Sequence, residues 1–341
     1  MIFLQRLLIM LHPKTKPFLQ NKNNLLAFSA GGDSSALFFL LLEANIPFDI
    51  AIVDYGIRVQ SKEEVAYAKE LAKKHHKECF VYEAPPLQSN FEAKAREIRY
   101  NFFEKLIATH HYDNLITAHH LGDRFEWMLM QFCKGAGCVE LSGMQMVEKR
   151  SNYTLIRPLL SQDKSELFDY LQTRNIHYFE DETNQNETYT RNAFRHQHAM
   201  PLLQKYKKGI QKSFAYIDKD RDLLITEEDG LQTHKKLAIF KKKPSTRNNI
   251  YIIDKYLKSL GHIITGAERK LLEDHTSVVV GRQYIITHWH NYIVIAPFLK
   301  QHATFSKEFK EKMRLLKIDP KLRAYLALEP DLVEFLSLLL A

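Results

Sequence analysis

The sequence predicts an α/β protein in which a doubly wound parallel sheet is followed by a basic helical region and a small α+β part. In the first half, short apolar runs alternate with segments of helical pattern, as in a parallel sheet with crossover helices. A loop of small residues follows the first apolar run, at the strand end where such sheets bind ligands. After about Met200 the pattern changes to lysine-rich helical stretches. We therefore expect three parts, over residues 1–205, 206–265 and 266–341.

Each expected element follows from its pattern. The buried strands are Leu25–Ser29, Phe48–Val53, Glu78–Tyr82 and Leu115–Ala118, and the helices between them are Ser34–Glu43, Lys62–His75, Phe91–His110 and Asp123–Cys133. Beyond them, 201–219 and 219–243 have helical patterns, and 277–280, 283–289 and 292–296 form short antiparallel strands turned at Gly281-Arg282 and His290-Asn291. The tail 305–340 returns to helix, and residues 1–11 form a short amphipathic helix.

Composition favours an ordinary globular enzyme with a polyanionic partner. The chain is 45% hydrophobic, which excludes disorder, and its formal net charge of +8 suits RNA without requiring it. The cysteines Cys79, Cys133 and Cys138 form no C-x-x-C pair, so we expect neither a disulfide framework nor a zinc or iron–sulfur site, and we place the protein in the reducing cytoplasm. No run approaches the ~18 apolar residues of a membrane span.

The loop Ser29-Ala30-Gly31-Gly32-Asp33-Ser34-Ser35 is the strongest candidate for a binding site. Glycines let the backbone approach an anion, hydroxyls donate to phosphate oxygens, and the free N–H groups of the following helix add positive potential. The chain has neither a Walker A sequence nor G-x-G-x-x-G, so this is a different phosphate loop. The alternative is a turn that merely packs a helix against the sheet.

Two arginine-containing motifs follow. Asp54-Tyr55-Gly56-Ile57-Arg58 closes the second strand, where Arg58 could reach a phosphate or RNA, although a simple turn explains it equally well. Arg96, Arg99 and Tyr100 share one helix face and form an anion clamp, unless that face is solvated and pairs with neighbouring glutamates.

An acidic motif follows the fourth strand. His120, Asp123 and Glu126 recur every three residues, so their side chains can share one side of a helix start. Carboxylates beside a phosphate loop hold magnesium or accept an ammonium group, and a histidine there can move protons. The alternative assigns Asp123 to a helix N-cap. Polar residues are then dense between 181 and 195, including Arg191 and Arg195.

Together these motifs resemble the tRNA(Ile)-lysidine synthases, a family of PP-loop ATP pyrophosphatases. That family carries, in order, S-G-G-x-D-S, an H-G-x-R-like turn, A-R-x-x-R-Y, H-H-x-D-D-x-x-E-T, R-P-L-L, a D-x-S/T-N segment and Y-x-R-N-x-x-R, and this chain shows counterparts of all seven between residues 25 and 201. It departs from the pattern at four places: Ala30 for a glycine, Asp54-Tyr55 for a histidine-containing pair, Gly122 for the first aspartate of the pair, and Trp127 for the threonine.

The resemblance implies a PP-loop fold, similar to the adenine nucleotide alpha hydrolases, and a ligase that forms a carbon–nitrogen bond. Such an enzyme uses ATP and Mg²⁺ to adenylate O2 of the wobble cytidine in the CAU anticodon of tRNA(Ile), releasing pyrophosphate. The ε-amine of L-lysine then attacks C2 and displaces AMP.

The implied ATP-binding residues are Ser29, Ala30, Gly31, Gly32, Asp33, Ser34 and Ser35. The expected catalytic residues are Asp33, His120, Asp123 and Glu126, of which Asp33 and Asp123 would hold the metal. Contacts with tRNA or other anions are assigned to Arg58, Arg96, Arg99, Arg191, Arg195, Lys241, Lys242 and Lys243. The lysines are assigned on charge alone, because no acidic run beside them matches their charge.

Three other functions remain open. A tRNA thiolase of the same group would need paired cysteines or an iron–sulfur cluster. An ATP-dependent amidating ligase shares the loop but does not call for a basic second half. A non-enzymatic RNA-binding protein would leave the acidic pair unexplained. The sequence also leaves open whether the chain is a monomer or a homodimer.

Overall fold

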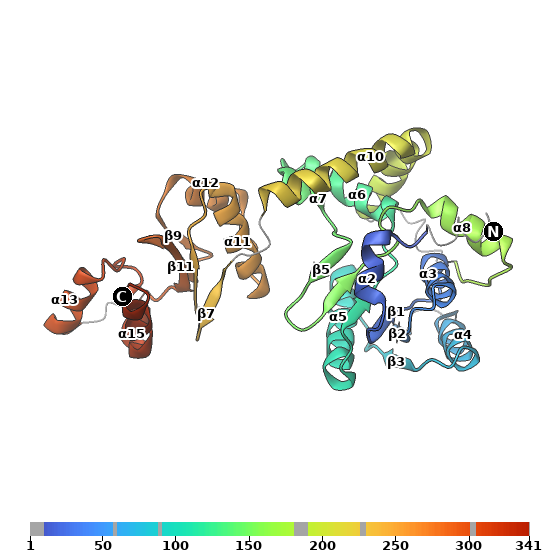
Figure 1. Ribbon diagram of the computed structural model, residues 1–341, viewed down its shortest axis with the longest axis horizontal. Helices are drawn as coiled ribbons and strands as arrows, with labels where there is room; N and C mark the ends of the chain where they lie inside the picture. Colours follow the sequence, from blue (N-terminus) through green and yellow to red (C-terminus); the bar gives the residue numbers. More distant parts are fainter. Residues whose placement is uncertain are drawn as a thin grey trace. The chain divides into compact units, whose positions relative to one another are not determined.

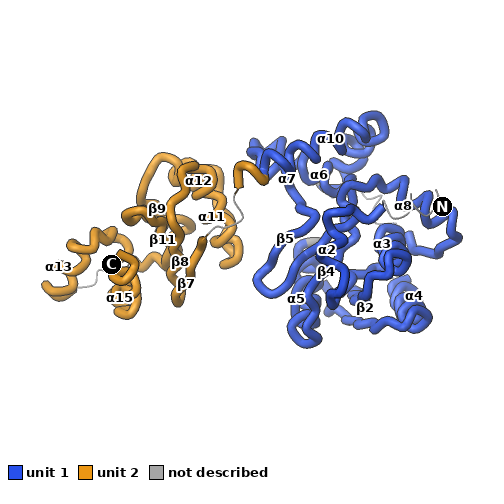
Figure 2. The backbone as a smooth tube through the Cα atoms, in the orientation of Figure 1, with its two compact units in different colours: residues 1–221 blue, residues 222–341 orange. Residues whose placement is uncertain are grey.

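The computed structural model describes residues 10–56, 60–87, 91–180, 190–225, 230–300 and 305–340. Arg58, the polar segment 181–189 and most of the expected N-terminal helix lie outside these ranges. Contacts divide the chain into two compact units, 1–221 and 222–341, shown in two colours in Figure 2. The three-part division at 205 and 265 stays a prediction. None of the described helices has the length and apolarity to cross a membrane.

Unit 1 contains the predicted doubly wound sheet. Its strands are β1 (Asn24–Ala27), β2 (Asp49–Asp54), β3 (Cys79–Glu83), β4 (Asn114–Ile116), β5 (Val147–Lys149) and β6 (Thr154–Ile156). The spatial order is β3-β2-β1-β4-β6-β5, and every neighbouring pair is parallel except β5 with β6. The prediction of a parallel sheet is confirmed, with an antiparallel edge strand that the sequence analysis does not include.

Helices cover both faces of this sheet (Figure 1). They are α2 (Lys16–Leu19), α3 (Gly32–Glu43), α4 (Gln60–Lys74), α5 (Phe91–His110), α6 (Leu121–Phe132), α7 (Cys138–Ser142) and α8 (Lys164–Thr173), with the 3-10 turn η1 (Pro13–Thr15) before α2. Successive strand residues point to opposite faces. Leu26 and Ile116 therefore pack with α3, α4 and α8, whereas Leu25 and Leu115 pack with α5.

The chain then leaves the sheet through α9 (Thr190–Phe194), a π-helical turn over Arg195–Ala199, and the long helix α10 (Met200–Leu224). Helix α10 confirms the helical pattern predicted over 201–219. Its apolar residues Leu203 and Phe214 pack against Leu121 and Phe125 of α6. Helix α10 thereby packs directly against α6, the helix that carries the acidic motif.

Unit 2 is built on a five-stranded antiparallel sheet in the order β7-β8-β11-β10-β9. The strands are β7 (Gln232–His234), β8 (Leu237–Lys241), β9 (Ser277–Val280), β10 (Tyr284–Trp289) and β11 (Tyr292–Pro297). Helices α11 (Thr246–Ser259) and α12 (Gly266–Asp274) cover one face, and α13 (Lys307–Leu315), α14 (Arg323–Leu328) and α15 (Pro330–Leu338) contribute to the core on the other. The predicted strands 277–296 and the helical tail are confirmed.

The helix predicted over 219–243 is wrong beyond α10. Residues 232–241 instead form the β7–β8 hairpin, which turns at Lys235, where φ is +55°. The run Leu237-Ala238-Ile239-Phe240 is buried on both faces of the sheet, because Leu237 and Ile239 pack in the core with α13–α15 and Ala238 and Phe240 pack in the core with α11 and α12. Burial against two layers thus overrides the helical tendency of the flanking lysines.

Ala30 lies in a left-handed conformation in the turn between β1 and α3. Its φ is +58°, and the residue is fully buried. Its carbonyl oxygen accepts hydrogen bonds from the Phe179 N–H at 2.9 Å and from Ser35 Oγ at 3.3 Å, which hold the turn in place. The family pattern has glycine here because glycine adopts this conformation without strain. Alanine therefore strains the turn, since a negative φ would be needed to avoid the clash of its Cβ.

We predict that Ala30→Gly is close to neutral for stability. Relief of roughly 1–2 kcal/mol of left-handed strain offsets the greater unfolded-state entropy, about 0.4–1 kcal/mol, and the lost methyl burial, about 0.8 kcal/mol. Ala36→Gly is the matched control, because Ala36 is equally buried but lies inside α3. It should destabilise by about 2 kcal/mol. Urea denaturation measures both, and equal losses would contradict strain at Ala30.

Candidate active site

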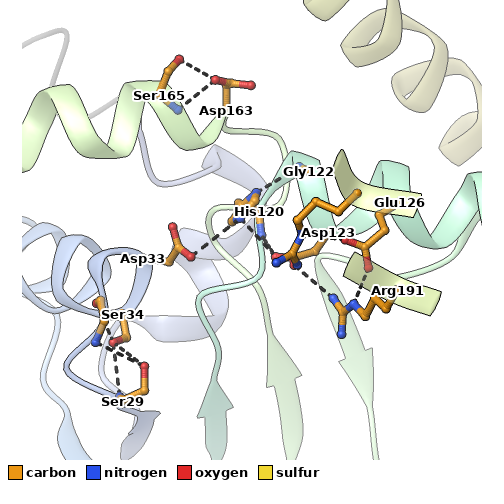
Figure 3. Close-up of polar contacts among 12 residues, drawn as sticks. Ser29, Asp33, Ser34, His120, Gly122, Asp123, Glu126, Asp163, Ser165 and Arg191 are labelled. Atoms are coloured by element: carbon orange, nitrogen blue, oxygen red, sulfur yellow. Dashed lines mark hydrogen bonds and ion pairs between the residues drawn. The ribbon is translucent and has the colours of Figure 1, made fainter. Parts of the chain in front are cut away.

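The loop after β1 forms a compact network of hydroxyl groups (Figure 3). Ser34 Oγ lies 3.1 Å from Ser29 Oγ and 3.2 Å from the Ser29 backbone nitrogen, and it donates to the Gly31 carbonyl at 3.0 Å. Gly31 is the N-cap of α3 and has no side-chain cap, so the first N–H groups of this helix are available to an anion. This is the arrangement that the phosphate-loop interpretation requires.

Two glycines allow this loop to pack closely against α8 and the segment after it. A Cβ atom on Gly32 would lie 2.7 Å from the Phe168 ring of α8, so a larger residue would separate the loop from that helix. Gly31 forms an isolated parallel bridge with Phe179. The Phe168 ring and the backbone of Phe179 therefore support the loop.

His120 and Asp123 face this loop and its Asp33 from beyond the end of β4. His120 is the N-cap of α6: its Nδ1 accepts the Gly122 N–H at 3.0 Å, and Asp123 Oδ2 accepts the His120 N–H at 3.0 Å. With Nδ1 accepting, the ring proton is on Nε2. That atom lies 3.5 Å from Asp123 Oδ2 and 3.7 Å from Asp33 Oδ2, as Figure 3 shows. The buried ring thus bridges the two loops.

The ring position of His120 depends on Gly122. A Cβ at residue 122 would lie 2.7 Å from His120 Cε1 and 3.0 Å from Nδ1. Any side chain there would displace the imidazole from its capping position. The departure of Gly122 from the family pattern is thereby linked to the geometry of a neighbouring site residue.

Asp123 and Glu126 form a four-charge cluster with Arg191 and Arg195. Glu126, which is almost fully buried, accepts from Arg191 Nε and, at 2.9 Å, from Arg195 Nε. Asp123 Oδ1 lies 3.2 Å from Arg191 Nη2 and 3.4 Å from Arg195 Nη2. Burial by itself would raise the pKa of the Asp123 carboxyl, but His120, His119 and Arg191 hold it well below its ordinary value. Asp123 is therefore ionised, and both acids are paired with arginines.

His119 lies next to this cluster and is neutral. Burial lowers the pKa of its ring to about 4, although Asp123 acts in the opposite direction. Its Nδ1 lies 2.9 Å from Thr117 Oγ1, and the positive charges of Arg157 and Arg96 act on it in the same direction as burial. The His119–His120 pair therefore consists of two histidines with different surroundings, of which only His120 is predicted from sequence to be a site residue.

The predicted clamp on α5 lies near the end of β2. Arg96 and Arg99 are both exposed, and the Arg96 guanidinium stacks 4.7 Å from the centre of the Tyr100 ring. Tyr55, just beyond β2, donates its hydroxyl proton to the Ala95 carbonyl at 2.9 Å. The pKa of this hydroxyl is raised, because the effect of burial exceeds the opposing effect of the charge and hydrogen bond of Arg99. Arg96 and Arg99 of α5 thus lie near the carboxyl end of β2, at the edge of the sheet where the loop after β1 also lies.

The structure brings most of the predicted site residues to one edge of the unit 1 sheet. The loop residues 29–35, His120, Asp123, Glu126, Arg191 and Arg195 are linked by the contacts above. Lys241, Lys242 and Lys243 belong instead to unit 2, where Lys241 is the last residue of β8 and the other two follow it. The first two are exposed, and Lys243 is half-buried with its backbone hydrogen-bonded to Asn249.

The sequence analysis misses Arg124, which anchors the acidic helix. Its side chain is only 2% exposed, and its Nε and Nη2 donate to the Ser142 carbonyl of α7 at 3.1 and 2.8 Å. The same guanidinium makes a bidentate pair with Asp218 of α10 and stacks 4.2 Å from the centre of the Phe214 ring. A charged residue in the middle of an amphipathic helix gives no signal of burial in sequence, because its partner is 94 residues away.

Comparison with known proteins identifies the class to which this fold and site belong. The family model of the PP-loop domain matches residues 4–203. A tRNA(Ile)-lysidine synthase from Campylobacter jejuni is 43% identical over 308 residues, covering 90% of this chain and 93% of the relative. One from Helicobacter pylori is 41% identical over 316 residues, covering 91% of each chain. The chain belongs to the tRNA(Ile)-lysidine synthase family, and it is an ATP-using enzyme of the PP-loop class.

A solved structure supports the fold independently. The U34-tRNA thiolase from Methanococcus maripaludis aligns with a TM-score of 0.53 at 15% sequence identity, covering 64% of this chain and 77% of the thiolase. At that identity the likeness concerns the fold alone. The resemblance drawn from the seven motifs is therefore confirmed at the level of fold and family.

We predict that Asp218→Ala destabilises unit 1 by about 2–4 kcal/mol, because it leaves the buried Arg124 guanidinium without a counter-charge. Asp220→Ala is the control, since Asp220 is exposed on the same helix and its loss should change stability by less than about 0.5 kcal/mol. Chemical denaturation of both variants provides the comparison. A loss at Asp218 no larger than that at Asp220 would show that the pair contributes nothing.

Proposed function

We propose that this chain is an ATP-dependent tRNA(Ile)-lysidine synthase that acts in the cytoplasm. The observation that carries the proposal is the juxtaposition of the hydroxyl-rich loop with His120 and two carboxylates at one sheet edge. In the first step, O2 of the wobble cytidine bonds to the α-phosphorus of ATP and pyrophosphate leaves. In the second, the ε-amine of lysine bonds to C2, the C2–O2 bond breaks, AMP leaves with that oxygen, and the amine loses a proton.

The phosphates of ATP would bind at the loop after β1. Ser29 and Ser34 supply hydroxyl groups, Gly31 and Gly32 allow close approach of the backbone, and the start of α3 supplies N–H groups. Such fixed donors stabilise the charge that develops on a transferring phosphoryl group, because they do not have to reorient during the reaction.

Asp33 fits a role in holding Mg²⁺. Its Oδ1 is buried and has no hydrogen-bond partner in the structure, which leaves an oxygen ligand unused. In the described part of the chain, no three acidic, histidine or cysteine side chains gather as a metal site, so the protein would supply one or two carboxylates and ATP the rest. Both oxygens of Asp123 already have partners, so Asp33 is the better candidate. Bound Mg²⁺ would neutralise charge on the departing pyrophosphate.

Asp123, Glu126, Arg191 and Arg195 would bind the amino acid. Lysine carries an ammonium group and a carboxylate, and this cluster offers carboxylates and guanidiniums side by side. In the structure these groups neutralise one another, so lysine binding would exchange one ion pair for another. His120, whose protonated Nε2 faces both aspartates, is the candidate to orient the adenylate by donating a hydrogen bond.

Contacts with tRNA are proposed for the exposed arginines and for the lysines of unit 2. Arg96 and Arg99 border the ATP site from α5 and suit the backbone of the anticodon loop. Lys241 and Lys242 are exposed at the end of β8 and suit phosphates elsewhere on the same RNA.

We predict that Asp33→Asn lowers lysidine formation at least about 100-fold, because the substitution removes the charge that would hold Mg²⁺. Stability should change by less than about 0.5 kcal/mol, since Asp33 Oδ1 makes no hydrogen bond that the variant would lose. Pyrophosphate release and lysidine content of tRNA(Ile) are the measurements. Near-normal turnover would remove Asp33 from the mechanism.

Omitting each substrate in turn separates this function from the alternatives. A lysidine synthase needs tRNA for any release of pyrophosphate, and it needs lysine as well for repeated turnover and for release of AMP. A thiolase would be indifferent to lysine, an amidating ligase would be indifferent to tRNA, and a non-enzymatic RNA-binding protein would release none.

We also predict that replacing Lys241, Lys242 and Lys243 together by glutamine weakens tRNA binding and flattens its salt dependence. Each lost phosphate contact reduces the slope of log K against log salt by about 0.7–0.9, because fewer counterions are released. ATP affinity should stay unchanged, since the ATP site lies in unit 1.

The matched control replaces Lys69, Lys73 and Lys74 of α4 by glutamine. These lysines are exposed, and their replacement removes the same positive charge from another part of the chain. Binding titrations at several salt concentrations compare the two triple variants. Equal slopes would mean that the unit 2 lysines are only a solvated surface.

A further inference from the structure

Trp127 is an exposed aromatic residue on the helix that carries the acidic pair. It lies four residues after Asp123, so it shares the side of α6 that carries this aspartate. Helical side chains lean toward the N-terminus, which places the indole over the turn that contains Asp123. Its side chain is nevertheless 44% exposed. An indole of this exposure borders the proposed site.

The indole has no partner that would explain its position. Within the part of the chain that the structure describes, Trp127 makes no hydrogen bond, ring stack or cation–π contact. Its Cδ1 edge rests on Gly143, where a Cβ would lie only 2.8 Å away and where φ is +60°. The backbone at Gly143 thus supports one edge of the ring, while nearly half of the residue is exposed.

The proposed reaction calls for such a surface. The reacting cytidine must be separated from its neighbours before its O2 can reach ATP, so at least one flanking base loses a stacking partner. Aromatic side chains compensate for this loss in proteins that bind single-stranded RNA, whichever base they meet. Arg191, which contacts both acids beside Trp127, adds a partly exposed positive charge.

We propose that Trp127 is a nucleobase-stacking site, which receives an unpaired base next to the reacting cytidine. This inference rests on the proposed function and deepens it, because it names the part of the RNA that the site holds. The family pattern has threonine at this position, so the site belongs to this chain rather than to the motif.

Tryptophan fluorescence tests the proposal without turnover. The chain has two tryptophans, and Trp289 is 2% exposed, with its Nε1 donating to the Leu316 carbonyl at 2.7 Å. The signal of Trp127 is the difference between the unchanged chain and Trp127→Phe. On addition of an RNA stem-loop with a CAU anticodon, this signal should be quenched and become protected from acrylamide. Unchanged emission and accessibility while the RNA binds, as measured by anisotropy, would overturn the proposal.

Kinetics supply a second test. Trp127→Ala should raise the KM for tRNA(Ile) about 5- to 100-fold, the range expected for one lost base stack, and leave the KM for ATP unchanged. Trp127→Phe should restore most of the affinity. Phe132→Ala is the control, because Phe132 is more exposed still but lies about 140° further round α6.

The outcomes separate the two proposals. If the unchanged chain forms no lysidine, the proposed function fails, while the fluorescence experiment still decides the stacking site. If lysidine forms but Trp127→Ala binds tRNA normally, or if Phe132→Ala loses as much affinity, the stacking site fails and the proposed function stands.

Discussion

The site depends on a buried pair of asparagine amides at the opposite end of its two central strands. Asn114 Nδ2 donates to Asn24 Oδ1 at 2.8 Å, and both side chains are almost completely buried. Asn24 also donates to the carbonyls of Leu19, Lys22 and Pro47. Sliding β4 against β1 by one residue would leave these amides unsatisfied and turn the apolar residues to the wrong faces. The register that follows sets the phosphate loop beside His120.

Helix α6 shows how a single element serves both chemistry and packing. Asp123 and Glu126 meet Arg191 of α9 and Arg195 of the π-helical turn, whereas Arg124 and Phe125 between them contact α10. Since a buried charge is tolerated only with a partner, each ionised residue of this stretch is matched by one of opposite sign. The same pairings that fix the orientation of the acids also hold the helix against the rest of unit 1.

Much of this could be predicted from sequence because the relevant signals are local. The strand, loop and helix around Ser29–Ser35 lie within twenty residues, and the family motifs are contiguous. Arg124 and the β7–β8 hairpin could not be predicted in this way. The burial of Arg124 is set by Asp218 and Phe214 on a distant helix, and that of Leu237–Phe240 by strands that follow much later in the chain. The lysines on either side of Leu237–Phe240 also favour the prediction of a helix over this segment.

The contact between Gly122 and His120 bears on how this chain departs from the family pattern. Because any Cβ at residue 122 would lie 2.7 Å from the His120 imidazole, an aspartate introduced there would displace the ring from its capping position. The family pattern carries a histidine at the position of His120 together with an aspartate at the position of Gly122. The two side chains are compatible only if the imidazole takes another rotamer, so the capping position of His120 in this chain is a consequence of Gly122.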